Sequence, residues 1–88
     1  MEIKVYDTYA LSEKGLKIHF DVMLPIGGDE ATAKEKALGF IEKISETANP
    51  VQLESCRFCH TETPKPEVGE RVEQEGCSIV PIDNCPDP

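Results

Sequence analysis

The N-terminus lacks every part of a secretory signal, because MEIKVYDTYA has no basic segment, no apolar stretch and no small-residue cleavage site. No apolar run elsewhere in the sequence approaches the roughly 20 residues that a membrane-spanning helix needs. These two absences favour a cytoplasmic protein over an exported or membrane-spanning one.

Positive charge is also scarce. Nine Lys and Arg residues face seventeen Asp and Glu residues, so the net charge is -8 and the isoelectric point is about 4.6. Such a surface repels nucleic-acid phosphates and anionic membranes. We therefore expect neither nucleic acid nor membrane as a partner, which leaves a protein or a small molecule.

Internal repeats, low-complexity blocks and long linkers are absent too. The 88 residues are therefore predicted to form a single domain, 1–88, with residues 83–88 as a flexible tail. Four cysteines in 88 residues, about 4.5%, fall below the roughly 8–10% that is typical of disulfide scaffolds. In a reducing compartment such thiols are more often metal ligands, redox groups or free side chains than bridges.

Two stretches near the N-terminus alternate between apolar and polar residues, and a short loop ending at Gly15 separates them. The alternation predicts an antiparallel hairpin of residues 2–11 and 16–24. Gly15 suits the left-handed residue that closes such a loop. Pairing Leu11 with Leu16 brings the two apolar faces together, and it places Asp7 on the packed face opposite Phe20. A carboxylate there is expected to be largely buried and hydrogen-bonded.

Two helices are predicted further along the chain. Apolar residues recur with helical spacing over residues 30–48, with Asp29 or Thr32 as the N-cap. A second helix near 66–75 begins at a proline and ends at Gly76, a natural residue for a helix C-terminus.

Short strands are predicted near residues 51–55 and 77–82. The order of elements is then ββαβαβ, which defines an α+β fold. We expect a small two-layer sandwich in which the hairpin belongs to one sheet and both helices pack on one face of that sheet.

The segment Cys56-Arg57-Phe58-Cys59-His60 has the C-x-x-C-H spacing of c-type haem attachment. Haem is disfavoured, because its attachment in bacteria follows export and no export signal is seen. Thiol redox chemistry needs an acidified thiol, usually at a helix N-terminus directly after C-x-x-C, and here four residues separate Cys59 from Pro64. Free cysteines without a metal, with His60 at a strand-to-helix corner, are the commonest arrangement for such a segment.

A structural zinc ion, or a similar metal, fits this segment better than haem or redox chemistry does. A C-x-x-C turn can direct two sulfurs at one ion, and a tetrahedral site needs two more ligands. We expect Cys56 and Cys59 to lie in one turn, with His60 or Cys85 completing the site, while Cys77 and His19 are further candidates. Such a site would stabilise a domain with a small core.

A second candidate site is the polar face of the hairpin. His19 and Asp21 are two residues apart on a strand, so they point the same way, and the predicted pairing places Tyr6 and Thr8 beside them. These four side chains form a set that could bind a ligand or perform acid–base chemistry, and Asp7, on the packed face in this pairing, is a further ligand-binding candidate. Such a set is more often a solvated or hydrogen-bonded sheet face than a functional site.

Several of these segments occur together in one protein family. They are VYDTY at 5–9, HFDV at 19–22, CRFCH at 56–60, and Gly76 followed by a strand that ends at Pro81-Ile82. In this order, over nearly the whole chain, they resemble the DUF2024 family, a small bacterial domain of unknown function. The resemblance implies a compact single-domain α+β protein of bacterial and cytoplasmic origin. It implies no activity. Cys77 stands where the family has an aromatic residue, which makes Cys56, Cys59 and Cys85 the better candidates.

Two classes of function therefore stay open at this point. One is a binding module that a metal ion holds together or that carries reactive thiols. The other is a ligand-binding or enzymatic domain that uses the His19 and Asp21 face.

Overall fold

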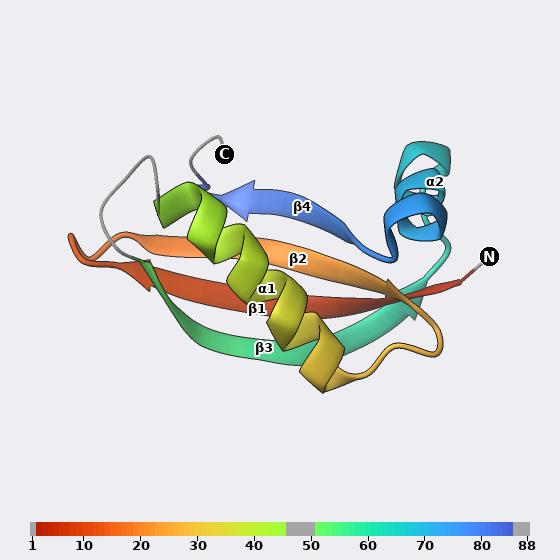
Figure 1. Cartoon of the computed structure of the whole chain (residues 1–88), viewed down its shortest axis with the longest axis horizontal. Helices are drawn as coiled ribbons and strands as arrows, with labels where there is room; N and C mark the ends of the chain where they lie inside the picture. The colour runs from red at the N-terminus through yellow and green to blue at the C-terminus, as the bar shows by residue number, and fades with distance from the viewer. Residues whose placement is uncertain (1, 46–50, 86–88) are drawn as a thin grey trace.

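The computed structural model describes residues 2–45 and 51–85. The described elements follow the order ββαβαβ, which confirms the predicted α+β fold. They are β1 (Ile3–Ser12), β2 (Lys17–Pro25), α1 (Glu30–Ser45), β3 (Val51–Glu62), α2 (Pro66–Glu75) and β4 (Ser78–Asp83). All four strands form one antiparallel sheet in the order β3-β1-β2-β4, so β1 and β2 are central (Figure 1).

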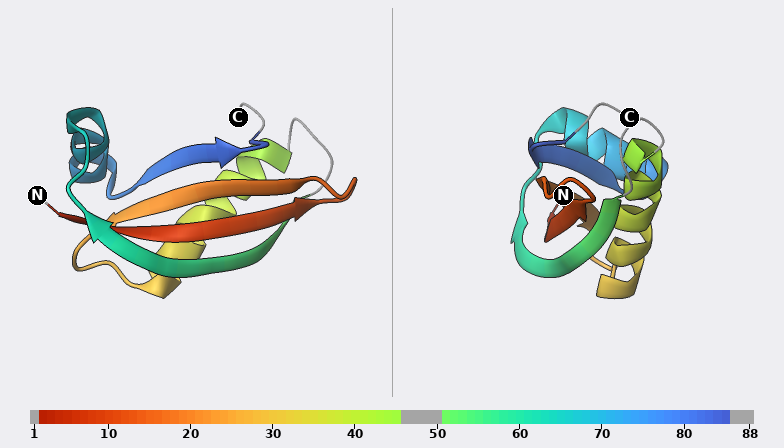
Figure 2. Two further views of the ribbon diagram at one scale, coloured as in Figure 1. Left: turned by 180° about the vertical axis from the view of Figure 1, so that it is seen from behind. Right: turned by 90° about the vertical axis from the view of Figure 1, so that its left-hand side faces the viewer.

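Helix α1 lies diagonally across one face of the sheet (Figures 1 and 2). The main core fills the space between this helix and the even-numbered residues of the two central strands. Phe20 is completely buried there and packs against Phe40 of α1, with ring centroids 4.8 Å apart. The buried members of this core are Tyr6, Ala10, Ile18, Phe20, Val22, Leu24, Ala33, Ala37, Ile41, Ile44, Val51 and Cys56.

Helix α2 packs against the opposite face of the sheet, at one end only, so the expectation that both helices share a face is wrong. Val72, with Val68 beside it, covers Ile3, Val5 and Met23. Successive residues of a strand point to opposite faces, and these three alternate with residues of the main core. No helix among the described residues covers the rest of this second face (Figure 2). The polar side chains described below lie there.

The pairing of β1 with β2 differs by one residue from the predicted pairing. Tyr9 lies opposite His19, and Asp7 lies opposite Asp21. The turn explains the shift, because Gly15 has a φ of 84° and its N–H donates to the Ser12 carbonyl at 2.9 Å. A turn followed by a left-handed glycine adds one residue to the loop. A slip by one residue moves every side chain of a strand to the other face.

The ends of the helices agree with the sequence signals. Asp29 is the N-cap of α1, since its side-chain oxygen accepts a hydrogen bond from the Thr32 N–H at 2.9 Å. Gly76 ends α2 with a φ of 80°. Helix α1 is described as far as Ser45, and the predicted residues 46–48 lie outside the described residues. No helix among the residues described is long and apolar enough to cross a membrane.

Strand β3 is much longer than the predicted strand at 51–55. It runs to Glu62, so the whole C-x-x-C-H segment lies in a strand paired with β1 instead of in a turn. Two irregularities interrupt this pairing, and Cys59 is the extra residue at one of them, because Tyr6 pairs with Phe58 while Val5 pairs with His60.

The segment expected to be a tail begins with Asp83, which is the last residue of β4. The Asn84 side chain donates to the Lys17 carbonyl at 2.9 Å, and the Cys85 thiol donates to the His19 carbonyl at 3.3 Å. These contacts hold Asn84 and Cys85 against β2.

Candidate functional site

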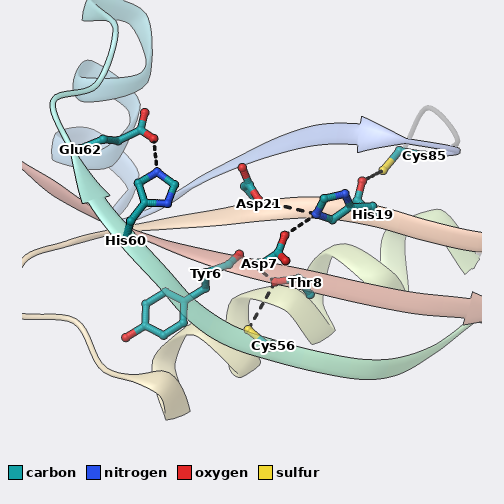
Figure 3. Close-up of polar contacts among 9 residues, drawn as sticks. All are labelled: Tyr6, Asp7, Thr8, His19, Asp21, Cys56, His60, Glu62 and Cys85. Carbon is teal, nitrogen blue, oxygen red and sulfur yellow. Dashed lines mark hydrogen bonds and ion pairs between the residues drawn. The ribbon is translucent and has the colours of Figure 1, made fainter.

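Three titratable side chains lie close together on the face of the sheet opposite α1. Asp7 of β1 and His19 and Asp21 of β2 point toward one another (Figure 3). Each offers one ligand atom, and the three atoms lie within 4.8 Å of one another. We call these residues the Asp–His–Asp cluster. They share a face because the observed pairing puts Asp7 beside Asp21 in the central strands.

The imidazole is the centre of this cluster. His19 Nε2 contacts Asp7 Oδ1 and lies 4.0 Å from Asp21 Oδ1. The His19 and Asp21 side chains are 22% and 21% exposed, and that of Asp7 is 38% exposed, so solvent reaches the cluster from one side. Asp7 is hydrogen-bonded as predicted, but it is only partly buried and lies on the other face of the sheet from Phe20.

Neighbouring groups hold the imidazole in place. The Tyr9 ring stacks on it, with centroids 4.3 Å apart and planes at 10°. Lys17 Nζ lies 5.0 Å from the centroid of the Tyr9 ring, on which it makes a cation–π contact. The Cys85 thiol bonds the backbone carbonyl of His19. Tyr9 was not predicted as a site residue, because the predicted pairing placed it opposite Ile18; the correct pairing would have identified it.

The cluster concentrates negative charge. Asp7 and Asp21 lie directly opposite each other, and like charges in that arrangement destabilise a sheet. Burial, and next the charge of Asp7, raises the pKa of the Asp21 carboxyl, while His19 opposes the rise. Arg57 lies across from Asp7 on β3, yet it forms no ion pair with a residue that the structure describes. The excess negative charge therefore remains available to a cation.

The raised pKa leads to a prediction about stability. Ionised Asp21 costs folding energy at a pH above its raised folded-state pKa, whereas below its unfolded-state pKa the carboxyl is neutral in both states. We therefore expect Asp21→Asn to raise the melting temperature in EDTA at neutral pH, and the gain to shrink as the pH falls from about 8 to about 3.5. The exposed carboxyl of Asp83 provides the control Asp83→Asn. An Asp21→Asn melting temperature at or below that of the parent at neutral pH would contradict the prediction.

Tyr6 and Thr8 do not join this cluster, so the prediction that they lie beside His19 and Asp21 is wrong. Both are buried on the α1 side of the sheet. Thr8 Oγ1 lies 3.4 Å from Cys56 Sγ, and the Tyr6 ring meets that of Phe58 edge-on at 5.8 Å. Burial raises the pKa of the Tyr6 hydroxyl. Tyr6 and Thr8 therefore belong to the buried core and not to the candidate site.

The extended conformation of β3 keeps the two cysteines of the C-x-x-C-H segment apart. Cys56 is buried in the core, whereas Cys59 is exposed. Three steps along a strand separate Cα atoms by about 10 Å, and a disulfide needs less than about 7 Å. Burial raises the pKa of the Cys56 thiol, which opposes thiolate formation. This geometry supports neither a redox pair nor a shared ion.

The other predicted metal ligands also lie apart. His60 is exposed and its Nε2 meets Glu62 Oε1 at 2.8 Å, while Cys85 reaches the backbone of β2 (Figure 3). Cys77 is half-buried against the main core. Among residues 2–45 and 51–85, the Asp–His–Asp cluster is the one group of three or more His, Cys, Asp or Glu residues whose ligand atoms lie close enough together to hold a metal ion.

The fold and the site together define a small α+β domain in which a four-stranded antiparallel sheet presents a cluster of two carboxylates and a histidine. The chain belongs to the family described as Domain of unknown function (DUF2024), whose model matches residues 1–82. The match confirms the resemblance seen in the sequence.

A solved structure is similar to the chain over nearly its full length. It is the NMR structure of protein NE1680 from Nitrosomonas europaea, with 38% sequence identity and a TM-score of 0.78. The match covers 98% of this chain and 100% of that one. No curated protein matches the chain in sequence.

Proposed function

We propose that this protein is a metal-binding domain whose site is the Asp–His–Asp cluster, and that the ion is a divalent first-row transition metal. The observation that carries the proposal is the convergence of one imidazole nitrogen and two carboxylate oxygens within 4.8 Å of one another. A small domain with an acidic surface and a sparsely covered sheet face suits such a binding role.

The spacing of the ligand atoms supports this proposal. Ligands about 2.0–2.2 Å from a zinc ion lie at most about 4.4 Å from one another. The His19 and Asp21 atoms, 4.0 Å apart, already meet that limit, whereas His19 Nε2 and Asp7 Oδ1 are in direct contact and must separate to admit an ion between them. An ion between the carboxylates would also convert the repulsion of Asp7 and Asp21 into attraction to a shared cation.

The ligand types indicate which ions the site would accept. Imidazole suits zinc, iron, copper and nickel, and carboxylates extend the range to manganese. Three protein ligands leave at least one coordination position for water or for a ligand, which is the arrangement of catalytic rather than structural zinc sites. The position of the cluster on a partly exposed face is compatible with such access.

Calorimetric titration of the EDTA-treated, reduced protein with Zn²⁺ and with Mn²⁺ tests the proposal. We expect one ion per chain. Asp7→Asn or His19→Gln should each weaken binding about 100-fold or more, since each variant removes one of three ligands. Elemental analysis of protein purified without added metal provides a second measurement.

Two control variants separate this site from the cysteine segment. His60→Gln removes the other histidine of the chain, which pairs with Glu62 outside the cluster. Cys59→Ser removes the exposed thiol of the C-x-x-C-H segment. Both variants should bind metal as the parent does. Zinc binding that survives His19→Gln and is lost in Cys59→Ser would refute the proposal in favour of a thiolate site.

A further inference from the structure

A groove lies between the two helices, and none of its lining residues belongs to the Asp–His–Asp cluster. It has a volume of about 670 Å³, within the 300–1,000 Å³ range of small-molecule sites. Strand β4 is an edge strand of the described sheet and runs from α2 toward the C-terminal end of α1 (Figure 1). Its first residues, Ser78 and Ile79, line the groove. The lining residues are Glu35, Lys36, Gly39, Phe40, Lys43, Arg71, Glu75, Cys77, Ser78 and Ile79.

The groove combines an apolar lining with local positive charge. Phe40, Cys77 and Ile79 are half-buried apolar side chains that pack on the main core. Three of the nine Lys and Arg residues of this acidic chain line the groove. Arg71 pairs with Glu75 at 3.8 Å, whereas Lys36 and Lys43 form no ion pair with any residue that the structure describes.

The two lysines lie on one side of α1. They are seven residues apart, two turns of the helix, with Gly39 and Phe40 between them. A ligand that meets the apolar side chains would therefore have an ammonium group near each end of this stripe.

Gly39 gives the groove part of its width. It lies in the middle of α1, where glycine is unfavourable relative to alanine. Its φ is not positive, and a Cβ atom there would meet nothing within 4 Å. Neither the backbone conformation nor the packing of the described residues requires this glycine. Its effect on the molecule is to leave space in the wall of the groove.

We propose that the groove binds a small amphipathic carboxylate, with its apolar part against Phe40 and Ile79 and its carboxylate near Lys36 or Lys43. A charge-assisted hydrogen bond from a lysine is the interaction that would favour an anion over its neutral counterpart. This site is separate from the proposed metal site and does not depend on it.

Octanoate is the probe for this proposal, and octanol, which has the same chain length without the charge, is its control. Both are titrated into ¹⁵N-labelled protein at low ionic strength, with amide shifts as the readout. Octanoate should shift the amides of residues 36–43 and 77–79, and octanol should bind at least about tenfold more weakly. Octanol binding as tightly as octanoate, shifts centred elsewhere, or no saturable shifts would overturn the proposal.

Two pairs of variants sharpen the test. Lys36→Gln with Lys43→Gln should weaken octanoate binding about tenfold or more, whereas Lys14→Gln in the hairpin turn should leave it unchanged. Gly39→Leu should abolish binding by filling the groove, while Gly39→Ala, which adds one methyl group, should retain it. Thermal unfolding of both glycine variants checks that the helix is intact, and the lysine variants decide the question if Gly39→Leu fails to fold. Parent-like affinity in a folded Gly39→Leu variant would overturn the proposal.

Discussion

Zn²⁺ at about 100 times its dissociation constant should raise the free energy of unfolding by about 2.7 kcal/mol, because an ion that binds only the folded state stabilises that state by mass action. For a domain of this size, that gain corresponds to a rise of about 10–20 °C in melting temperature. EDTA should reverse the rise completely. Thermal unfolding followed by circular dichroism, with and without EDTA, measures both changes.

The variant His19→Gln should lose this stabilisation, and Cys59→Ser should keep it. Free thiols of the unfolded chain can also bind zinc, which would reduce the effect. Mn²⁺ provides an independent measurement, because carboxylates suit this ion and thiolates do not. Stabilisation by zinc that is equal in the parent and in His19→Gln would place the ion outside the Asp–His–Asp cluster and contradict the proposed function.

Phe20→Ala should lower the free energy of unfolding by about 3–5 kcal/mol, the usual cost of removing a fully buried aromatic ring. Phe20 is completely buried and packs against Phe40 of α1 at 4.8 Å. A domain of 88 residues has a total stability of about 4–13 kcal/mol, so this one change removes a large part of it. Urea denaturation followed by circular dichroism measures the loss.

Phe58→Ala is the matched control for the core substitution. Phe58 is 52% exposed and contacts Tyr6 edge-on, so its removal should cost only about 0.5–1.5 kcal/mol. Equal losses in the two variants would mean that the main core is not centred on Phe20 and α1.

Signals carried by a few neighbouring residues were sufficient to predict the elements of this fold. Asp29 and Gly76 mark helix ends because the groups they satisfy lie within one turn of them. Gly15 marks a turn because its left-handed conformation is a property of a single residue. Residues 51–62 were harder to predict, since their pairing partner β1 is about 50 positions away in the sequence. The isolated C-x-x-C-H pattern therefore suggested a turn where the chain forms a strand.

Assignment of the sheet faces failed for a related reason. Ile3 and Val5 look like part of one apolar face with Tyr9, but they are apolar because α2 covers one end of the second face. Tyr9, farther along the same face, stacks on His19 outside that cover. Alternation alone does not distinguish one covered face from two faces that are each covered along part of their length.

The sequence by itself determined the class of the fold, the order of its elements, the acidic character of the surface, and His19 and Asp21 as neighbours on one strand. Only the tertiary structure decided that Asp7 joins them, that Tyr6 and Thr8 do not, and that Cys56 and Cys59 lie apart. The first group of properties depends on composition and on contacts between residues close in sequence. The second depends on one residue of register between β1 and β2, and on which helix covers which face, both of which are set by packing between distant segments.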